Sequence, residues 1–420
     1  MSIDYQVELE KIGKQAKKAS TSLALMSCRV KNRALEAMAE ALNENATELM
    51  AANDKDMANG AAAGLTESLL DRLKLTPERI EGMAKGLLGV ASLKDPVGRI
   101  ESTFHRPNGL VIERTRVPIG VIGIIYEARP NVTADAAGLC LKSGNVSILR
   151  GGKEAMNSNR MIADILYKTG VESGLPEGFM QFIPWVDRTA VNVMLKLDKY
   201  IHLIIPRGGE SLIEAVVRES TIPVVKNYKG VCHIYVDVAA DLEMATEIIV
   251  NAKCQRPSVC NAIEAILVHK DVAADFVPKV QAALVAANCE VRGDEAYRTY
   301  APEANEITEA DRGIEFSDLV LAASVVEDID EAMDYISNYS SGHSESIISA
   351  DKEACRRFQM TVDSAAVYAN ASTRFTDGSE FGMGAEIGIS TDRLHARGPM
   401  GLDELTTYKY IINGTGQVRA

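Results

Sequence analysis

Hydrophobic residues recur at helical spacing through the first 95 residues of the chain. Met38 and Leu42, for example, lie four positions apart, which places their side chains on one face of an α-helix. Thr76 stands directly before Pro77, an arrangement typical of an N-cap residue followed by proline in the first helical turn. The pattern therefore predicts a series of helices in this region.

The pattern changes to alternation between about residues 100 and 118. Asn108-Gly109 lies within this stretch, and Asn-Gly between two strand-like runs predicts a β-hairpin. Residues 408 to 414 form a predicted terminal strand, and the glycine- and alanine-rich stretch 59–64 a predicted turn. Because strand edges carry unpaired N–H and C=O groups, we expect the hairpin and the terminal strand to find partners in another subunit.

From residue 119 onward, short apolar runs alternate with helical patterns. Such alternation is typical of an α/β protein with a doubly wound parallel sheet, whose ligands bind at the carboxyl ends of the strands. The predicted strands cover residues 119–126, 146–149, 179–183, 201–205, 222–225, 263–267, 319–322, 346–348 and 365–369. The predicted helices cover residues 134–142, 157–171, 188–197, 210–219, 242–253, 271–287 and 328–338, with a further helix capped by Asp351.

Composition narrows the class of protein. A chain of 420 residues predicts two or three domains, and a net charge of -13 argues against binding to nucleic acid or anionic membranes. No export signal or membrane-length apolar run is visible, and the seven cysteines lack the spacing of a disulfide framework, so we expect a cytoplasmic protein with reduced thiols. The six histidines lack metal-ligand spacing, and no metal site is predicted.

Cys260 lies in a polar turn between the predicted helix 242–253 and the predicted strand that begins at Ile263. A thiol on such a turn can meet backbone N–H groups that stabilise its thiolate, which makes Cys260 a candidate nucleophile. The alternative is a small buried hydrophobe, and position alone favours that alternative. Cys254 and Cys260 could also pair under oxidation.

Two predicted strands end in glycine-rich turns that carry cations. These turns are Arg150-Gly151-Gly152-Lys153 and Arg207-Gly208-Gly209. Glycines let backbone N–H groups approach a phosphate, and a following helix N-terminus favours negative charge. Neither turn matches a dinucleotide or P-loop motif, so phosphate binding and a plain tight connection both stay open.

Several segments together resemble the gamma-glutamyl phosphate reductases, a family within the aldehyde dehydrogenase superfamily. The resemblance runs nearly end to end and is carried by Tyr126-Glu127-Ala128-Arg129-Pro130-Asn131-Val132, Arg150-Gly151-Gly152-Lys153-Glu154-Ala155, Arg256-Pro257-Ser258-Val259-Cys260-Asn261, and Ala385-Glu386-Ile387-Gly388 with His395-Ala396-Arg397-Gly398-Pro399. It implies an aldehyde dehydrogenase-like α/β fold with a doubly wound parallel-sheet cofactor domain, a second α/β catalytic domain and a β-hairpin oligomerisation flap.

On this basis we expect an NADP-binding domain at residues 1–99 and 119–231, a catalytic domain with a nucleophilic cysteine at 232–404, and the flap at 100–118 and 405–420. The flap implies a homo-oligomer.

The resemblance also implies an activity. The expected reaction is the NADPH-dependent reduction of L-glutamyl 5-phosphate to L-glutamate 5-semialdehyde and phosphate through a Cys260 thioester. This reaction is the second step of proline biosynthesis from glutamate, so functional coupling to a glutamate 5-kinase is possible. Asn131 and the Cys260 backbone N–H are the implied oxyanion donors. Aldehyde-oxidising relatives carry a Glu-Leu-Gly-Gly motif whose carboxylate activates water, whereas residues 226–230 here are Lys-Asn-Tyr-Lys-Gly, which favours reduction over hydrolysis.

The remaining candidate residues would bind the coenzyme and the substrate. The cofactor candidates are Arg150 and Lys153 for the additional phosphate of NADPH, Arg207, Gly208 and Gly209 at the second glycine turn, and Glu315 for the nicotinamide ribose. The substrate candidates are Arg393, His395 and Arg397. The alternative for Arg150 and Lys153 is that they are solvated surface charges. The alternative for His395 is a capping or core role. A CoA-acylating aldehyde dehydrogenase and a non-catalytic scaffold are the alternative functions.

Overall fold

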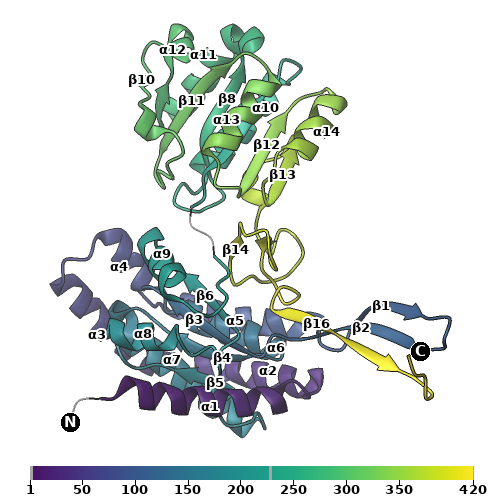
Figure 1. Ribbon diagram of the computed structural model, residues 1–420. Helices are drawn as coiled ribbons and strands as arrows, with labels where there is room; N and C mark the ends of the chain where they lie inside the picture. Colours follow the sequence, from purple (N-terminus) through teal and green to yellow (C-terminus); the bar gives the residue numbers. More distant parts are fainter. Residues whose placement is uncertain (1–2, 227–228, 420) are drawn as a thin grey trace. The chain divides into compact units, whose positions relative to one another are not determined.

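The computed structural model describes residues 3–226 and 229–419, which fall into two units (Figure 1). Unit 1 comprises residues 1–226, 382–388 and 400–420, and unit 2 comprises 227–381 and 389–399. The chain therefore passes between the units four times. Residues 382–388 and 400–404, which lie within the predicted catalytic domain, belong to unit 1.

Unit 1 begins with the predicted series of helices. They are α1 (Tyr5–Leu23), α2 (Cys28–Glu44), α3 (Ala46–Ala62), α4 (Glu67–Leu73) and α5 (Pro77–Ser92). The Thr76 side chain accepts a hydrogen bond from the Arg79 N–H and caps α5, as predicted. The predicted turn at 59–64 is wrong, because α3 continues to Ala62. A Cβ on Gly60 would lie 2.9 Å from a Leu65 methyl carbon, so a glycine in this helix permits close packing.

The sheet of unit 1 is parallel and has the order β5-β4-β3-β6. Its strands are β3 (Val121–Tyr126), β4 (Val146–Arg150), β5 (Met180–Phe182) and β6 (Leu203–Arg207), and its helices are α6 (Asn131–Lys142), α7 (Met156–Glu172), α8 (Arg188–Met194) and α9 (Glu210–Glu219). Every residue of β3 is buried, as expected of a strand covered on both faces. The predicted strand at 222–225 is reduced to one bridge, between Val224 and Ile204.

The strand order of unit 1 reverses beside β3. The chain runs from β3 outward to β5 and then returns to place β6 on the other side of β3. The carboxyl ends of β3 and β6 therefore flank the topological switch point, the expected place for a ligand in an open α/β sheet.

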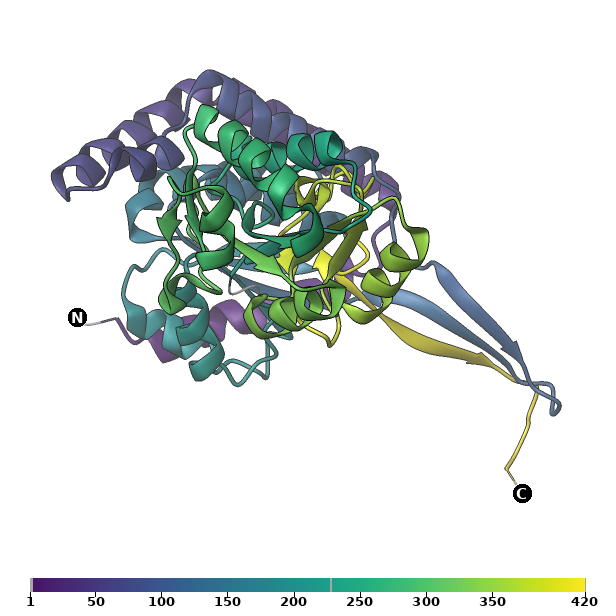
Figure 2. The ribbon, with the colours of Figure 1, turned by 90° about the horizontal axis from the view of Figure 1, so that it is seen from above.

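A separate three-stranded sheet extends away from the helices of unit 1 (Figures 1 and 2). It contains β1 (Ile100–His105), β2 (Val111–Pro118) and β16 (Thr406–Asn413) in the order β1-β2-β16. The predicted hairpin is confirmed, and Gly109 takes the positive φ of 87° that its turn requires. β16 pairs with β2 of the same chain along its whole length. The terminal strand thus already has a partner on one edge, contrary to the expectation.

Unit 2 contains a seven-stranded parallel sheet of order β10-β9-β11-β8-β7-β12-β13. Its strands are β7 (Cys232–Val236), β8 (Ile263–His269), β9 (Glu290–Gly293), β10 (Asn305–Glu306), β11 (Val320–Val326), β12 (Ser344–Ile348) and β13 (Ala366–Ala369). Its helices are α10 (Leu242–Cys254), α11 (Lys270–Ala286), α12 (Glu295–Tyr300), α13 (Ile329–Tyr339) and α14 (Lys352–Thr361).

Two apolar cores cover the faces of this sheet. Ile234 and Val236 of β7 belong to one core, which includes side chains of α10 and α11. Tyr235 belongs to the other, with side chains of α13 and α14. Successive side chains of a strand point to opposite faces, so this division shows that β7 is buried on both sides. None of the described helices is long and apolar enough to cross a membrane.

Candidate functional site

Cys260 lies in the turn between α10 and β8, where the sequence predicts it. Two contacts fix its backbone within unit 2. The Cys232 thiol donates to the Cys260 carbonyl oxygen over 3.3 Å, and a Cβ built on Gly230 would stand only 2.0 Å from that same oxygen. Position 230 therefore accepts only glycine without moving the nucleophile candidate.

A buried polar network continues behind Cys232. His343 Nδ1 lies 3.7 Å from the Cys232 sulfur and 2.8 Å from the Ser344 hydroxyl. Ser344 in turn contacts the Thr376 hydroxyl at 2.7 Å. Burial lowers the pKa of His343 to about 4, so this imidazole is neutral at pH 7. The network is thus suited to hold the turn and does not supply a charge.

The position of Cys260 differs from the general rule for α/β sheets. Cys232 begins β7 and Ser344 begins β12, so their contacts place the Cys260 turn at the amino ends of the strands of unit 2.

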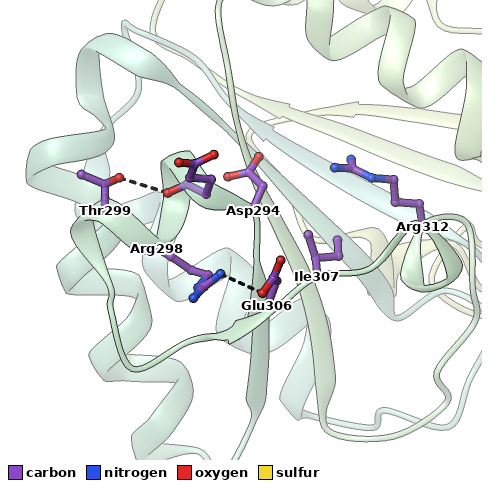
Figure 3. Close-up of a pocket in the computed structure, with 7 residues that line it drawn as sticks. Asp294, Arg298, Thr299, Glu306, Ile307 and Arg312 are labelled. Carbon is purple, nitrogen blue, oxygen red and sulfur yellow. Dashed lines mark hydrogen bonds and ion pairs between the residues drawn. The ribbon is translucent and has the colours of Figure 1, made fainter.

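A pocket of about 530 Å³ does lie beside the carboxyl ends of β9 and β10 (Figure 3). There, Arg298 and Glu306 point toward each other and form a 3.4 Å ion pair. The described residues that line it include none of the predicted site residues.

The thiol of Cys254 has a partner other than Cys260. The neighbouring Cys289 thiol, which donates to the Glu290 carbonyl oxygen over 3.6 Å, lowers the pKa of Cys254, and Cys254 raises the pKa of Cys289. No disulfide joins any of the cysteines in the described part of the chain, and no group of three or more His, Cys, Asp or Glu side chains there is placed to hold a metal ion.

Asn131 is the first residue of α6, directly beyond β3 in unit 1. Its side-chain amide donates a 2.9 Å hydrogen bond to the Asp135 carboxylate one helical turn later. Burial raises the pKa of Asp135 to about 6, and the hydrogen bond from Asn131 acts against this rise. Asp135 therefore fixes the orientation of the Asn131 amide, one N–H of which is used in this bond.

The two glycine turns of unit 1 both contact the segment that follows β3. The Gly209 N–H donates to the Glu127 carboxylate over 2.9 Å, and a Cβ on Gly152 would lie 3.2 Å from the Glu127 carbonyl carbon. The structure thus brings both turns to the switch point. Glu127, which the sequence did not single out, already accepts a hydrogen bond from the second turn.

The cations of these turns have different surroundings. The Arg150 guanidinium donates to the Val186 carbonyl oxygen over 2.9 Å, and burial lowers its pKa. Lys153 is exposed. Arg207 packs over Gly388, where a Cβ would lie 2.6 Å from its guanidinium.

Glu315 belongs to unit 2, in a segment tied to a buried ion pair. Lys253 and Glu264 are both buried and lie 2.5 Å apart, and the second oxygen of Glu264 accepts a 3.3 Å hydrogen bond from the Ser317 N–H. Burial raises the pKa of Glu264 to about 7 although Lys253 lowers it. The ion pair therefore holds the segment that carries Glu315.

The three substrate candidates lie in the turn between β14 (Ile389–Ser390) and β15 (Gly398–Pro399) of unit 2. Arg393 and Arg397 both form ion pairs with Asp363, the latter at 2.7 Å. The hydrogen bond from Arg397 is the main reason why the pKa of Asp363 is lowered. His395 has a left-handed φ of 66°. The structure thus brings the two arginines together through a carboxylate that the sequence analysis missed.

The candidate residues are distributed over both units. Unit 1 holds the Asn131, Arg150, Lys153 and Arg207 group, and unit 2 holds the Cys260, Glu315, Arg393, His395 and Arg397 group. Gly230, Cys232 and Asp363 were not predicted, and a glycine just before an apolar run was the only signal that could have indicated Gly230. Asn227 and Tyr228 of the segment that lacks the hydrolytic carboxylate lie outside the described residues.

Comparisons with known proteins agree on one family. Residues 4–300 match the aldehyde dehydrogenase family. The chain is 58% identical to gamma-glutamyl phosphate reductase of Caldanaerobacter subterraneus subsp. tengcongensis over 98% of this chain and 100% of the relative. A crystal structure of gamma-glutamyl phosphate reductase from Thermotoga maritima aligns with a TM-score of 0.97 at 47% identity, covering 98% of this chain and 100% of that one. An acetylating aldehyde dehydrogenase from Geobacillus thermoglucosidasius shares the fold, with a TM-score of 0.67 at 16% identity over 99% of this chain and 98% of that one.

Proposed function

Since the chain belongs to the aldehyde dehydrogenase family and, within it, to the gamma-glutamyl phosphate reductases, we propose that a Cys260 thioester carries its reaction. The enzyme is an oxidoreductase that reduces L-glutamyl 5-phosphate to L-glutamate 5-semialdehyde and phosphate, the second step of proline biosynthesis from glutamate. The observation that carries the Cys260 assignment is the turn whose backbone is fixed by Gly230 and Cys232.

In the proposed reaction the Cys260 thiolate attacks the acyl carbon of the substrate. The carbon–sulfur bond forms, the bond from carbon to the phosphate oxygen breaks, and phosphate leaves with the electron pair. A nucleophile of this kind divides one difficult step into two easier ones. After reduction, the tetrahedral adduct on Cys260 releases the aldehyde and regenerates the thiolate.

An oxyanion forms at each tetrahedral stage. Asn131 and the Cys260 backbone N–H are the proposed donors, and loss of one such donor typically costs about 3 kcal/mol of transition-state stabilisation. Support for Asn131 comes from its place at the start of α6 and from Asp135, which holds the amide orientation.

The coenzyme of this proposal is NADPH, which supplies the hydride when bound. The two glycine turns that meet at the switch point of unit 1 support binding of a dinucleotide there, and the Arg150 and Lys153 cations would bind its phosphate charge. Arg207, Gly208 and Gly209 would hold the remainder of the dinucleotide at the end of β6. Glu315 of unit 2 would bind the nicotinamide ribose.

The substrate also carries an amino-acid head group. Arg393, His395 and Arg397 are the proposed contacts for it, and the two arginines both form ion pairs with Asp363. We further propose a cytoplasmic homo-oligomer that forms through the β1-β2-β16 sheet, with functional coupling to a glutamate 5-kinase.

The test of the proposed function is the reverse reaction of the purified protein. Oxidation of L-glutamate 5-semialdehyde with NADP should require inorganic phosphate and should disappear in Cys260→Ala. Activity that needs coenzyme A in place of phosphate would instead indicate an acylating aldehyde dehydrogenase, and no activity with either would leave a non-catalytic protein.

A further inference from the structure

Arg374 is bound on both sides to the loop that carries Cys260. It lies in a short 3-10 turn, η3 (Thr373–Phe375) of unit 2. Its guanidinium donates to the Asn261 side-chain oxygen and, over 3.2 Å, to the Gln255 side-chain oxygen. Asn261 directly follows Cys260, and Gln255 directly precedes Arg256. The guanidinium is therefore held against the loop between these two positions.

The backbone around Arg374 is fixed to the same loop. The Thr373 hydroxyl donates to the Asn261 carbonyl oxygen over 2.7 Å, and the Asn261 amide donates to the carbonyl oxygens of Thr376 and Arg374 at 2.9 and 3.3 Å. Asn261 is 5% exposed. A buried amide with all these bonds satisfied holds its neighbours in one arrangement, so η3 and the residue that follows Cys260 are fixed to each other.

A second arginine, Arg256, directly follows Gln255, whose side-chain oxygen accepts the hydrogen bond from Arg374. Partial burial lowers the pKa of Arg374, and the positive charge of Arg256 lowers it further, while Cys260 and Asp377 act in the opposite direction. Among the described residues, no ion pair within 4.0 Å engages either Arg256 or Arg374. Arg393 and Arg397, by contrast, share Asp363. Arg374 is thus anchored to the loop that carries the thiol, and the exposed Arg256 follows the residue that anchors it.

We infer that Arg256 and Arg374 form the binding subsite for the phosphate group of the acyl phosphate. This inference rests on the proposed function and extends it, because the earlier candidates account for the amino-acid head group and not for the phosphate. Guanidinium groups bind phosphate through paired charge-assisted hydrogen bonds. As the bond between the acyl carbon and the phosphate oxygen breaks, charge grows on that oxygen, and the two cations stabilise it. The same cations favour the Cys260 thiolate.

Steady-state kinetics of the reverse reaction measure the KM for inorganic phosphate separately from the KM for the aldehyde. Arg256→Gln removes a cation for which the described residues show no hydrogen bond to the loop. Arg374→Gln removes the cation that is hydrogen-bonded to the loop. Each should raise the KM for inorganic phosphate by about tenfold or more while the KM for glutamate semialdehyde changes by less than about threefold. Arg374→Lys should recover part of the loss, because it restores charge without the planar fork. Arg357→Gln, on the outer face of α14, is the matched control and should leave both constants unchanged.

A second measurement does not depend on turnover. Inorganic phosphate should slow the alkylation of Cys260 by iodoacetamide in the parent protein, and the protection should disappear in the two glutamine variants but persist in Arg357→Gln. If the parent turns over and both glutamine variants retain its KM for phosphate and its protection, the subsite inference is wrong. If the parent is inactive yet phosphate protects Cys260 through these arginines, the proposed function fails and the phosphate subsite stands.

Discussion

Gly230 lies directly against the backbone of Cys260: a Cβ at position 230 would stand 2.0 Å from the Cys260 carbonyl oxygen and 2.4 Å from its Cα. Both atoms belong to the backbone, so no side-chain rotation can relieve the overlap. The turn that carries the proposed nucleophile would have to move by roughly an ångström to admit a methyl group, and displacements of that size at reacting groups cost about 10²-fold in rate.

Gly230→Ala should therefore lower kcat/KM by about two orders of magnitude while the protein still folds. Gly82→Ala is the matched control, since nothing lies within 4 Å of a Cβ there and alanine should stabilise α5 by about 0.5 to 1 kcal/mol. Steady-state kinetics and thermal unfolding of both variants check this. Unchanged kinetics for Gly230→Ala would show that the Cys260 turn can shift to admit a methyl group without loss of rate.

Cys260→Ala should lower turnover by about 10³-fold or more, because no other group replaces the nucleophile. Cys254→Ser should have a far smaller effect, since the proposed reaction assigns Cys254 no role and its pKa is governed by the neighbouring Cys289. Kinetics together with a coenzyme-binding titration separate chemistry from folding. An equal loss in both variants would point to a structural role for the two thiols.

The Asp135 carboxyl gives a pH-dependent prediction. Its pKa is raised from 3.8 to about 6 in the folded protein. The folded state therefore binds this proton more tightly, and the associated stability is present below about pH 4 and lost as the pH rises through about 6.

Asp135→Asn removes the titration and keeps a side-chain oxygen for the Asn131 amide. Its unfolding free energy should exceed that of the parent above pH 6 by on the order of 1 kcal/mol, and the difference should shrink toward pH 4. Denaturant unfolding across this range is the measurement. A difference independent of pH would mean that Asp135 does not titrate there.

Changing Arg150 and Lys153 together to Ala should raise the Michaelis constant for NADPH by about one to two orders of magnitude, since hydrogen bonds to a charged group contribute about 1.5 to 3 kcal/mol. The constant for NADH should change little. Because Arg150 also donates to the Val186 carbonyl oxygen, Lys153→Ala alone is the cleaner variant, with the exposed Lys168→Ala as control. An equal loss for both coenzymes would place these residues on the shared part of the dinucleotide.

The β1-β2-β16 sheet exposes large apolar side chains, among them Phe104, Tyr410 and Ile412. Deletion of residues 408–420 should give a smaller species in light scattering. Ile412→Lys tests the surface without removing β16, and Val418→Lys, beyond the strand, is the control. A monomeric parent at micromolar concentration would contradict the proposed assembly.

Most helices and strands could be predicted because their apolar residues follow the periodicity of the element. β7 was not predicted: its five residues include Cys232 and His233, which do not form a simple apolar run, yet all five are buried by helices on both faces. For residues 59–64 the error is the reverse: a turn was predicted where the chain is helical. Gly60 there permits close packing of a helix and does not mark a turn.

For the site, the local setting of Cys260 was predictable because a turn between two periodic segments is visible in the sequence. Its supporting contacts were not, since Gly230, Cys232 and Arg374 reach Cys260 or its neighbour across 28 to 113 positions. Such pairings are set by how the strands align in the sheet, which periodicity does not specify. The Asp363 ion pairs with Arg393 and Arg397 belong to the same class.

The four passages of the chain between the units have a consequence for cutting and rejoining the protein. A break after Lys226 would leave a C-terminal fragment that still contains β16, whose eight paired residues lie along β2 of the other fragment. The halves are therefore candidates for reassembly as a split enzyme. Conversely, a single crossover between related genes after residue 226 would exchange unit 2 together with residues 382–388 and 400–420 of unit 1, and so would exchange β16 without β2.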